Sequence, residues 1–213
     1  SPGPAPLSHA DTLCRHATMW RITADLWDSW DDIVEDMDRC AQWAPYVGQG
    51  NWPDADMLPL GHLSLIGSEH GIGERMTRLS RDEQVTMMTL WCLCRSPLMF
   101  GGEMRDNDAF TLSLLTNREV LALLSHSSGA RRTIRNDNFQ VWQAKGENST
   151  YVALFNVSTI PRRIGVPLYH LGLEGTYRVY DLWEKKEIGT VEDIWQDELR
   201  NHQCRLLKLT KEA

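Results

Sequence analysis

Residues 80–102 read SRDEQVTMMTLWCLCRSPLMFGG, and this stretch predicts a buried helix followed by a short strand. Ser80 and Glu83 have the spacing of a capping box, so we expect the helix to begin after Ser80. It continues to about Arg95 and is apolar nearly all round, which requires burial on several sides. The apolar run 97–100 then predicts a strand that ends at a Gly-Gly pair. A buried helix next to such a strand is typical of β/α folds.

The residues before and after this stretch continue the alternation of helices and short strands. Ser29, with Asp32 three residues later, predicts a helix that Pro45 ends. The other elements expected in this part are a strand over Met57–Leu60, a long loop over Gly61–Gly73, and one or two helices within Leu112–Leu124 capped by Asn117.

The pattern changes after Gly129 to alternating apolar and polar residues in short runs. These runs lie at 138–143, 151–156, 177–180 and 205–209, with turn residues between them. Short strands at such spacing predict an antiparallel sandwich or barrel. We therefore expect two domains, a β/α part over residues 1–128 and an all-β domain over residues 129–213.

The first part is too short to be a complete β/α barrel. A closed (β/α)8 barrel takes about 250 residues, and half a barrel leaves an open sheet edge. The chain opens on Ser-Pro-Gly-Pro-Ala-Pro, without Met, which is typical of a loop that leaves a strand. We expect an upstream barrel half that these 213 residues do not contain.

Composition excludes several kinds of partner. The net charge of -7 argues against nucleic acid, because phosphate binding needs a basic face. No apolar run approaches the roughly 18 residues of a membrane span. The five cysteines and seven histidines have no metal-ligand spacing, so we expect buried free thiols, no metal and no cofactor. The nine tryptophans suit either a core or the stacking of sugar rings.

Three stretches carry acidic residues near the ends of expected strands. They are WRITADLWDSW over 20–30, NWPDADML over 51–58 and SPLMFGGEMRDND over 96–108. Each also has a purely structural interpretation: Asp28 to Asp32 as acids at a helix N-terminus, Asp54 as a turn residue, and Asp106 or Asp108 as a cap. Their shared position favours chemistry, because β/α barrels place active sites at the C-terminal ends of their strands.

Taken in order, these stretches resemble glycoside hydrolase family 27 of clan D, the melibiase or α-galactosidase family. The resemblance includes LWCLCRSPLMFGG over 90–102 and LLTNREVL over 114–121. It extends to the β-rich end through DLW at 181–183 and CRLLKL at 204–209. It implies an α/β fold, the C-terminal part of a (β/α)8 TIM barrel followed by an antiparallel β-sandwich domain. It also implies glycoside hydrolysis with retention.

The resemblance assigns roles to four residues. It implies that Asp25 is the general acid/base, that Arg21 and Asp56 bind the sugar, and that Met57 lines the pocket. Retaining hydrolysis needs a second carboxylate, about 5–5.5 Å from the first, as nucleophile. The family's Lys-x-Asp nucleophile motif has no counterpart in this chain, so we expect the isolated chain to be inactive.

The substrate is left open at this stage. Galactose-containing glycans are the expected partners, together with the upstream barrel half. α-N-Acetylgalactosaminides and β-L-arabinopyranosides remain alternatives, as does a non-catalytic carbohydrate-binding or truncated fragment. The family implies a secreted or periplasmic protein.

Overall fold

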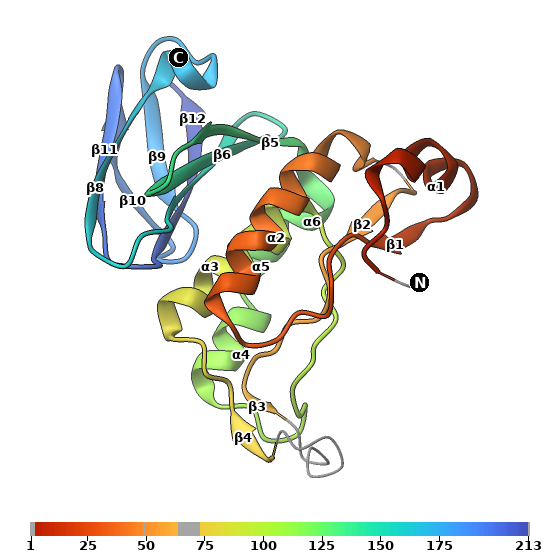
Figure 1. Ribbon diagram of the computed structural model, residues 1–213. Coiled ribbons are helices and arrows are strands. Elements are labelled where there is room, and N and C mark those ends of the chain that lie inside the picture. Colours follow the sequence, from red (N-terminus) through yellow and green to blue (C-terminus); the bar gives the residue numbers. More distant parts are fainter. Residues whose placement is uncertain (1–2, 49, 64–72, 213) are drawn as a thin grey trace.

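The computed structural model describes residues 3–48, 50–63 and 73–212. Helices and short strands form the first part of the chain, and a sheet-rich part follows (Figure 1). The first part consists of η1 Leu7–His9, α1 Ala10–His16, β1 Met19–Arg21, α2 Trp30–Trp43, η2 Ala44–Tyr46, β2 Trp52–Asp54, β3 His62–Leu63, β4 Arg75–Met76, α3 Arg81–Cys94, α4 Ala109–Leu115, α5 Arg118–Leu121 and α6 Leu123–His126. Residues 64–72 of the expected loop lie outside the described residues.

Strands β1 and β2 run parallel, as neighbouring strands of a β/α barrel do, whereas β3 and β4 form a short antiparallel pair. β1 pairs with β2 in register from Met19 and Trp52 to Arg21 and Asp54. The segment after β2 pairs in parallel with the segment around Phe100 through an isolated bridge between Leu58 and Phe100. The full strands predicted over 57–60 and 97–100 were therefore wrong. The positive φ of Asp56 turns the chain after β2, and Pro59 and Pro97 lack the N–H that a ladder needs.

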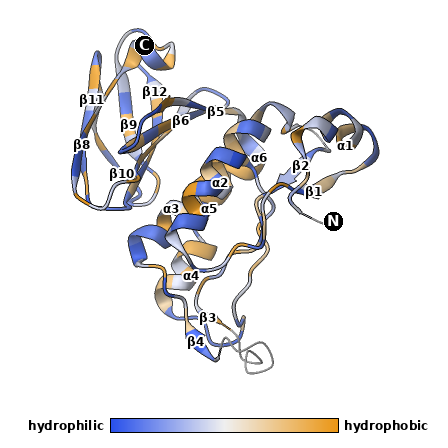
Figure 2. Cartoon of the chain, in the orientation of Figure 1, coloured by the Kyte–Doolittle hydropathy of each residue, from blue (hydrophilic) through white to orange (hydrophobic). Residues whose placement is uncertain are grey.

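The helix starts were predicted with mixed success. Ser80 and Glu83 form the expected capping box at the start of α3, and Arg95 ends this helix in the left-handed conformation. Asn117 caps α5 through its side chain, as predicted. Ser29 precedes α2, but its side chain makes no cap hydrogen bond, so that part of the prediction was wrong. α2 is amphipathic, with hydrophilic and hydrophobic residues along it (Figure 2).

The second part is an antiparallel sandwich, as predicted. A six-stranded sheet has the order β10-β9-β12-β7-β6-β5, and β8 pairs with β11 in a second, two-stranded sheet. The elements are β5 Ser128–Arg135, β6 Phe139–Lys145, β7 Thr150–Asn156, β8 Arg162–Pro167, η4 Leu168–Leu171, β9 Tyr177–Asp181, β10 Lys186–Val191, β11 Ile194–Leu199 and β12 Cys204–Lys211.

The six-stranded sheet lies between two hydrophobic cores. One face packs on the two-stranded sheet, with Leu207 of β12 and Val166 of β8 in the same core. The other face packs on the helices, where Leu206 of β12 shares a core with Leu90 and Leu93 of α3. Because this second core contains residues of both parts, helices and sandwich pack as one body. The division at residue 128 stays a prediction.

Candidate functional site

The four residues that the sequence singled out lie where β1 and β2 end. Arg21 is the last residue of β1, and Asp56 follows β2 by two residues. Because parallel strands end at the same edge of a sheet, the two side chains meet there. The Nη1 atom of Arg21 lies 2.8 Å from Oδ1 of Asp56. Its Nη2 atom lies 3.3 Å from Oδ1 of Asp25 and donates to the carbonyl of Ala24 at 2.6 Å.

The two carboxylates differ in how tightly they are held. The Asp56 side chain is 13% exposed, and its Oδ2 atom also accepts a hydrogen bond of 2.6 Å from the N–H of Leu26. The Asp25 side chain is 88% exposed and, within the part of the chain that the structure describes, is held by one contact of 3.3 Å with Arg21. Asp25 is therefore open to a bound molecule, whereas Asp56 and Arg21 are fixed beneath it.

The backbone conformation of Asp56 is held by three hydrogen bonds. Its φ of 81° is unusual for a residue other than glycine. The N–H of Asp56 donates to Oδ1 of Asp54 at 2.9 Å, and the N–H of Ala55 donates to Oγ of Ser96 at 2.9 Å. Nε1 of Trp91 donates to the carbonyl of Asp56 at 3.0 Å. Asp54, expected as a turn residue, is thus a buried acceptor at the site, and burial raises the pKa of its carboxyl.

Met57 lies beside this cluster and packs against the next chain segment. A Cβ placed on Gly101 would lie 2.8 Å from Sδ of Met57 and 3.2 Å from the carbonyl oxygen of Leu58. A side chain at position 101 would therefore displace the Met57 thioether from this packing. Met57 is half-buried and follows directly after Asp56.

Asp28 has a different role from the one that the sequence suggested. Its side chain is fully buried and accepts from Nη2 of Arg75 at 2.8 Å and from the N–H of Arg78 at 2.7 Å. Burial alone would raise the pKa of this carboxyl, but the hydrogen bonds from Arg75 and Arg78 outweigh it and lower the pKa. Asp28 thus fixes the segment around β4 to the loop that carries Asp25. Local sequence gives no signal for this contact, because 47 residues separate the partners.

The remaining acidic candidates have structural partners. Asp108 caps α4 by accepting from the N–H of Thr111 at 2.6 Å, as the alternative interpretation had it. Asp106 lies 2.6 Å from Nδ1 of His62. Asp36, which the sequence reasoning missed, is a buried acid on α2 whose Oδ2 atom has no hydrogen-bond partner among the described residues. Burial, followed by repulsion from nearby acids, raises its pKa to about 8.

Cysteine and histidine side chains do not gather into an ion site within the described residues. Four of the five cysteines are buried and Cys14 is half-buried, and all five are free thiols. No group of three or more potential metal ligands occurs in the described ranges. None of the described helices combines the length and the hydrophobicity of a membrane span.

Two family models match the chain, one for each part. The α-galactosidase A model matches residues 6–125. The model of the α-galactosidase C-terminal β-sandwich domain matches residues 136–209. The chain belongs to the melibiase family. The fold expected from the sequence, the C-terminal part of a TIM barrel followed by a β-sandwich, is confirmed by these matches and by the solved family members.

Relatives within the melibiase family act on related sugars. An α-galactosidase of Oryza sativa subsp. japonica is 28% identical over 92% of this chain and 45% of its own length. The solved family 27 β-L-arabinopyranosidase of Geobacillus stearothermophilus is 47% identical, with a TM-score of 0.97, over 100% of this chain and 49% of that one. A solved Bacillus halodurans protein proposed to be an α-N-acetylgalactosaminidase is 39% identical, with a TM-score of 0.84, over 100% of this chain and 49% of that one. The chain thus spans about half the length of these relatives.

Proposed function

We propose that the protein containing this chain is a retaining glycosidase of the α-galactosidase type, with Asp25 as its general acid/base. The observation that carries the proposal is the placement of Asp25 and Asp56 on one guanidinium, that of Arg21, at the end of two parallel strands. A carboxyl that transfers protons must reach the substrate, and Asp25 is the exposed member of the pair.

The proposed reaction proceeds in two displacements. A carboxylate of the upstream barrel half attacks the anomeric carbon, the glycosidic bond breaks, and Asp25 gives its proton to the departing oxygen. Asp25, now a carboxylate, removes a proton from water, which attacks the anomeric carbon and releases the sugar. The enzyme carboxylates return to their starting states.

The three other residues orient the sugar in this proposal. Arg21 and Asp56 offer a charged donor and a charged acceptor for ring hydroxyls, and such bonds are both strong and directional. Met57 supplies an apolar wall beside them. Orientation of this kind lowers the barrier because the reacting groups are held in place before reaction.

β-L-Arabinopyranosides are a second candidate substrate beside α-D-galactosides. The specific observation is the 47% identity to an arabinopyranosidase, against 28% to the rice α-galactosidase. The two sugars share their ring stereochemistry, and the arabinoside lacks the exocyclic hydroxymethyl group. The ratio of kcat/KM for the 4-nitrophenyl β-L-arabinopyranoside to that for the α-D-galactoside decides between them, with the α-N-acetylgalactosaminide as a third arm.

The acid/base role is tested by Asp25→Asn in the intact protein. We expect turnover of an alkyl glycoside to fall by about 10³-fold, because its leaving oxygen needs a proton. Formation of the glycosyl-enzyme from a dinitrophenyl glycoside, whose leaving group needs none, should be nearly unchanged in a pre-steady-state burst. The control is Asp31→Asn, an exposed acid on α2. Wild-type turnover of both substrates by Asp25→Asn would remove Asp25 from this role.

The alternative is a carbohydrate-binding chain without catalysis. The same 4-nitrophenyl substrates, given to the 213-residue chain alone, separate the two cases. We expect no hydrolysis by the isolated chain, because it lacks a Lys-x-Asp nucleophile motif, and hydrolysis by the intact protein. An inactive intact protein that still binds galactosides would favour the binding role.

A further inference from the structure

The helices cover only one end of the six-stranded sheet. On one face of β12, Cys204 and Leu206 lie buried in the core that the sheet shares with the helices. Lys208 and Thr210 continue the same face, because side chains alternate along a strand, and neither is buried. The face of β12 that points towards the helices is thus apolar and buried at Cys204 and Leu206, and polar and at least partly exposed at Lys208 and Thr210.

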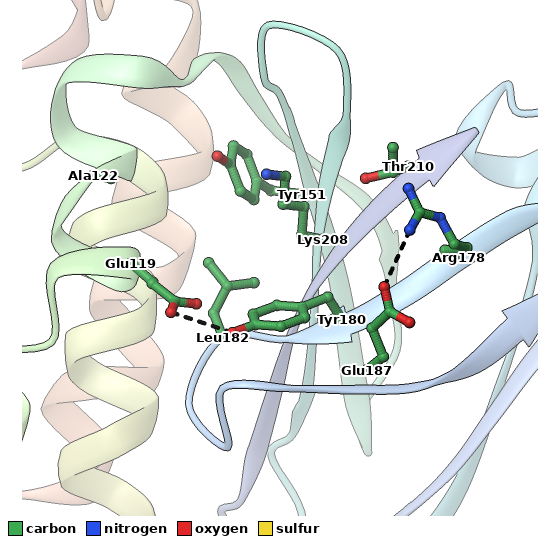
Figure 3. A pocket seen from close by; sticks show the side chains of 9 residues that line it. All are labelled: Glu119, Ala122, Tyr151, Arg178, Tyr180, Leu182, Glu187, Lys208 and Thr210. Atoms are coloured by element: carbon green, nitrogen blue, oxygen red, sulfur yellow. Dashed lines mark hydrogen bonds and ion pairs between the residues drawn. The ribbon is translucent and has the colours of Figure 1, made fainter. Parts of the chain in front are cut away.

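A cavity of about 420 Å³ opens on this uncovered end, against α5. Figure 3 shows Tyr151, Tyr180 and Lys208 around it, with Glu119 reaching in from the helix. A second cavity of about 230 Å³ shares Tyr151, Lys208 and Thr210 with the first and continues towards Asn148. The two form one groove, here called the Tyr151–Tyr180 groove.

Strand register arranges the floor of this groove as a row. Lys208 of β12 is paired with Tyr151 of β7 on one side and with Tyr180 of β9 on the other. Tyr180 is paired in turn with Glu187 of β10. Since neighbouring strands are 4.7–4.9 Å apart, the two tyrosines lie roughly 10 Å apart, with a lysine between them.

The groove carries donors and acceptors of both charge signs. Arg178 pairs with Glu187 at 3.3 Å, and the hydroxyl of Tyr180 donates to Glu119 at 3.2 Å. Lys208 has no ion pair among the described residues, and it shares the first cavity with Glu119 and the second with Glu147. Burial raises the pKa of both tyrosines, so their hydroxyls stay protonated at neutral pH. Two cations, Arg178 and Lys208, and three anions, Glu119, Glu147 and Glu187, line the groove, and charges of both signs side by side do not favour a strongly charged ligand.

We propose that the Tyr151–Tyr180 groove binds a neutral oligosaccharide. The half-buried ring of Tyr180 can stack on the C–H face of a sugar, while Tyr151, which is 8% exposed, belongs to the floor of the groove. The surrounding charged side chains can donate to sugar hydroxyls or accept from them. The cavity volume lies within the range of ligand pockets. In Figure 1 the helices α2, α3 and α5 lie between this sheet and strands β1 and β2, so the groove is separate from the Asp25 site. The choice of a galactose-bearing ligand rests on the proposed function.

Titration calorimetry with a galactosylated manno-oligosaccharide tests the groove, on the 213-residue chain and on the intact protein carrying Asp25→Asn, which leaves the probe uncleaved. Tyr180→Ala and Lys208→Ala should each weaken binding about tenfold, while Tyr180→Phe, which keeps the ring, should lose much less. Tyr169→Ala is the matched control, because Tyr169 is 67% exposed on η4, outside the groove. Thermal melts of each variant check folding. If Tyr180→Ala unfolds, the affinities of Tyr180→Phe and Lys208→Ala are compared instead, and only Lys208→Ala should bind the probe much more weakly than the wild type.

The outcomes separate this groove from the Asp25 site. Binding should survive Asp25→Asn unchanged; loss of binding in that variant, with retention in Lys208→Ala, would overturn the inference. No binding by the wild type, or tighter binding of an oligogalacturonate than of the neutral probe, would also overturn it. If the intact protein hydrolyses no glycoside yet binds the probe through Tyr180 and Lys208, the proposed function fails and the groove stands.

Discussion

At residue scale, Arg21 has the most consequential contacts. Its guanidinium reaches the carboxylates of Asp25 and Asp56 at once, at 3.3 and 2.8 Å. A planar fork of donors can do this, whereas a lysine ammonium is a point charge on a flexible stem. The position of Asp25 relative to Asp56 therefore depends on the shape of this side chain as well as on its charge.

Arg21→Lys in the intact protein should lower kcat/KM by about 10–100-fold, because a charge-assisted bond of about 1.5–3 kcal/mol is lost. Steady-state kinetics with a 4-nitrophenyl glycoside measures this. The control is Arg15→Lys, because the exposed Arg15 side chain donates to the carbonyl of Asp11 on its own helix and to no other described residue. Equal kinetics for both variants would show that the fork at Arg21 is dispensable.

The buried carboxyl of Asp36 predicts how the stability of the protein depends on pH. With a pKa of about 8, the folded protein keeps this proton where the unfolded chain, with a pKa near 3.8, has released it. The folded state therefore binds more protons between these values, and this group makes stability fall as the pH rises from about 4 to 8. Asp36→Asn removes the titration and should be more stable than the wild type at pH 8 by about 1–3 kcal/mol, with little difference at pH 4.5.

Urea denaturation at the two pH values checks this expectation. Asp31→Asn, on the exposed side of the same helix, serves as the control and should change stability little at either pH. If Asp36→Asn and the wild type have the same free energy of unfolding at both pH 4.5 and pH 8, the titration of Asp36 does not contribute to stability.

At the scale of elements, α2 and α3 offer a direct comparison of helix caps. Both helices have 14 residues, and both follow a serine with extended backbone. The hydroxyl of Ser80 accepts from the N–H of Glu83, and the carboxylate of Glu83 accepts from the N–H of Ser80 at 2.7 Å. Ser29 makes neither kind of bond. The same residue type thus caps one helix and merely precedes the other.

Ser80→Ala should destabilise the chain by about 1 kcal/mol, the usual cost of a lost N-cap. Ser29→Ala is the built-in control and should cost less than half as much, since no cap bond exists to lose. Chemical denaturation of the two variants gives both values. Equal losses would show that the hydroxyl bond at Ser80 contributes nothing.

At the scale of the whole molecule, the shared core decides how the chain unfolds. Leu206 of β12 is fully buried together with residues of α3, and Nε1 of Trp183 donates to Oγ1 of Thr89 at 2.8 Å across the same boundary. Contacts of this kind couple the helices to the sheet. We therefore expect a single cooperative transition for both parts.

Leu206→Ala should lower the free energy of unfolding by about 2–5 kcal/mol, because it leaves a cavity in the shared core. The free energy of unfolding from circular dichroism at 222 nm, which reports the helices, and that from hydrogen exchange of the β12 amides should fall by the same amount. Leu112→Ala, at a 46% exposed position on α4, is the control. A variant in which the strands open while the helices melt as in the wild type would show two independent units.

Features that depend on neighbours along the chain could be predicted from the amino-acid sequence. The capping box at Ser80 and the cap at Asn117 involve residues within three positions, and the strand alternation after Gly129 has a period of two. Ordered motifs also carried the family resemblance, which the family models confirmed. The roles of Arg21, Asp25, Asp56 and Met57 stay proposals.

Features that depend on which distant segments become neighbours could not be predicted in this way and became visible in the folded chain. Asp28 meets Arg75 across 47 residues, although its place at a helix start suggested a dipole role. The left-handed turn at Asp56 is held by Ser96 and Trp91, and the strand lies before it, over Trp52–Asp54, whereas the apolar run predicted a strand after it, over 57–60. The row of Tyr151, Lys208 and Tyr180 exists only once β12 lies between β7 and β9. Strand order and register are set by the packing of the whole chain, and no local pattern encodes them.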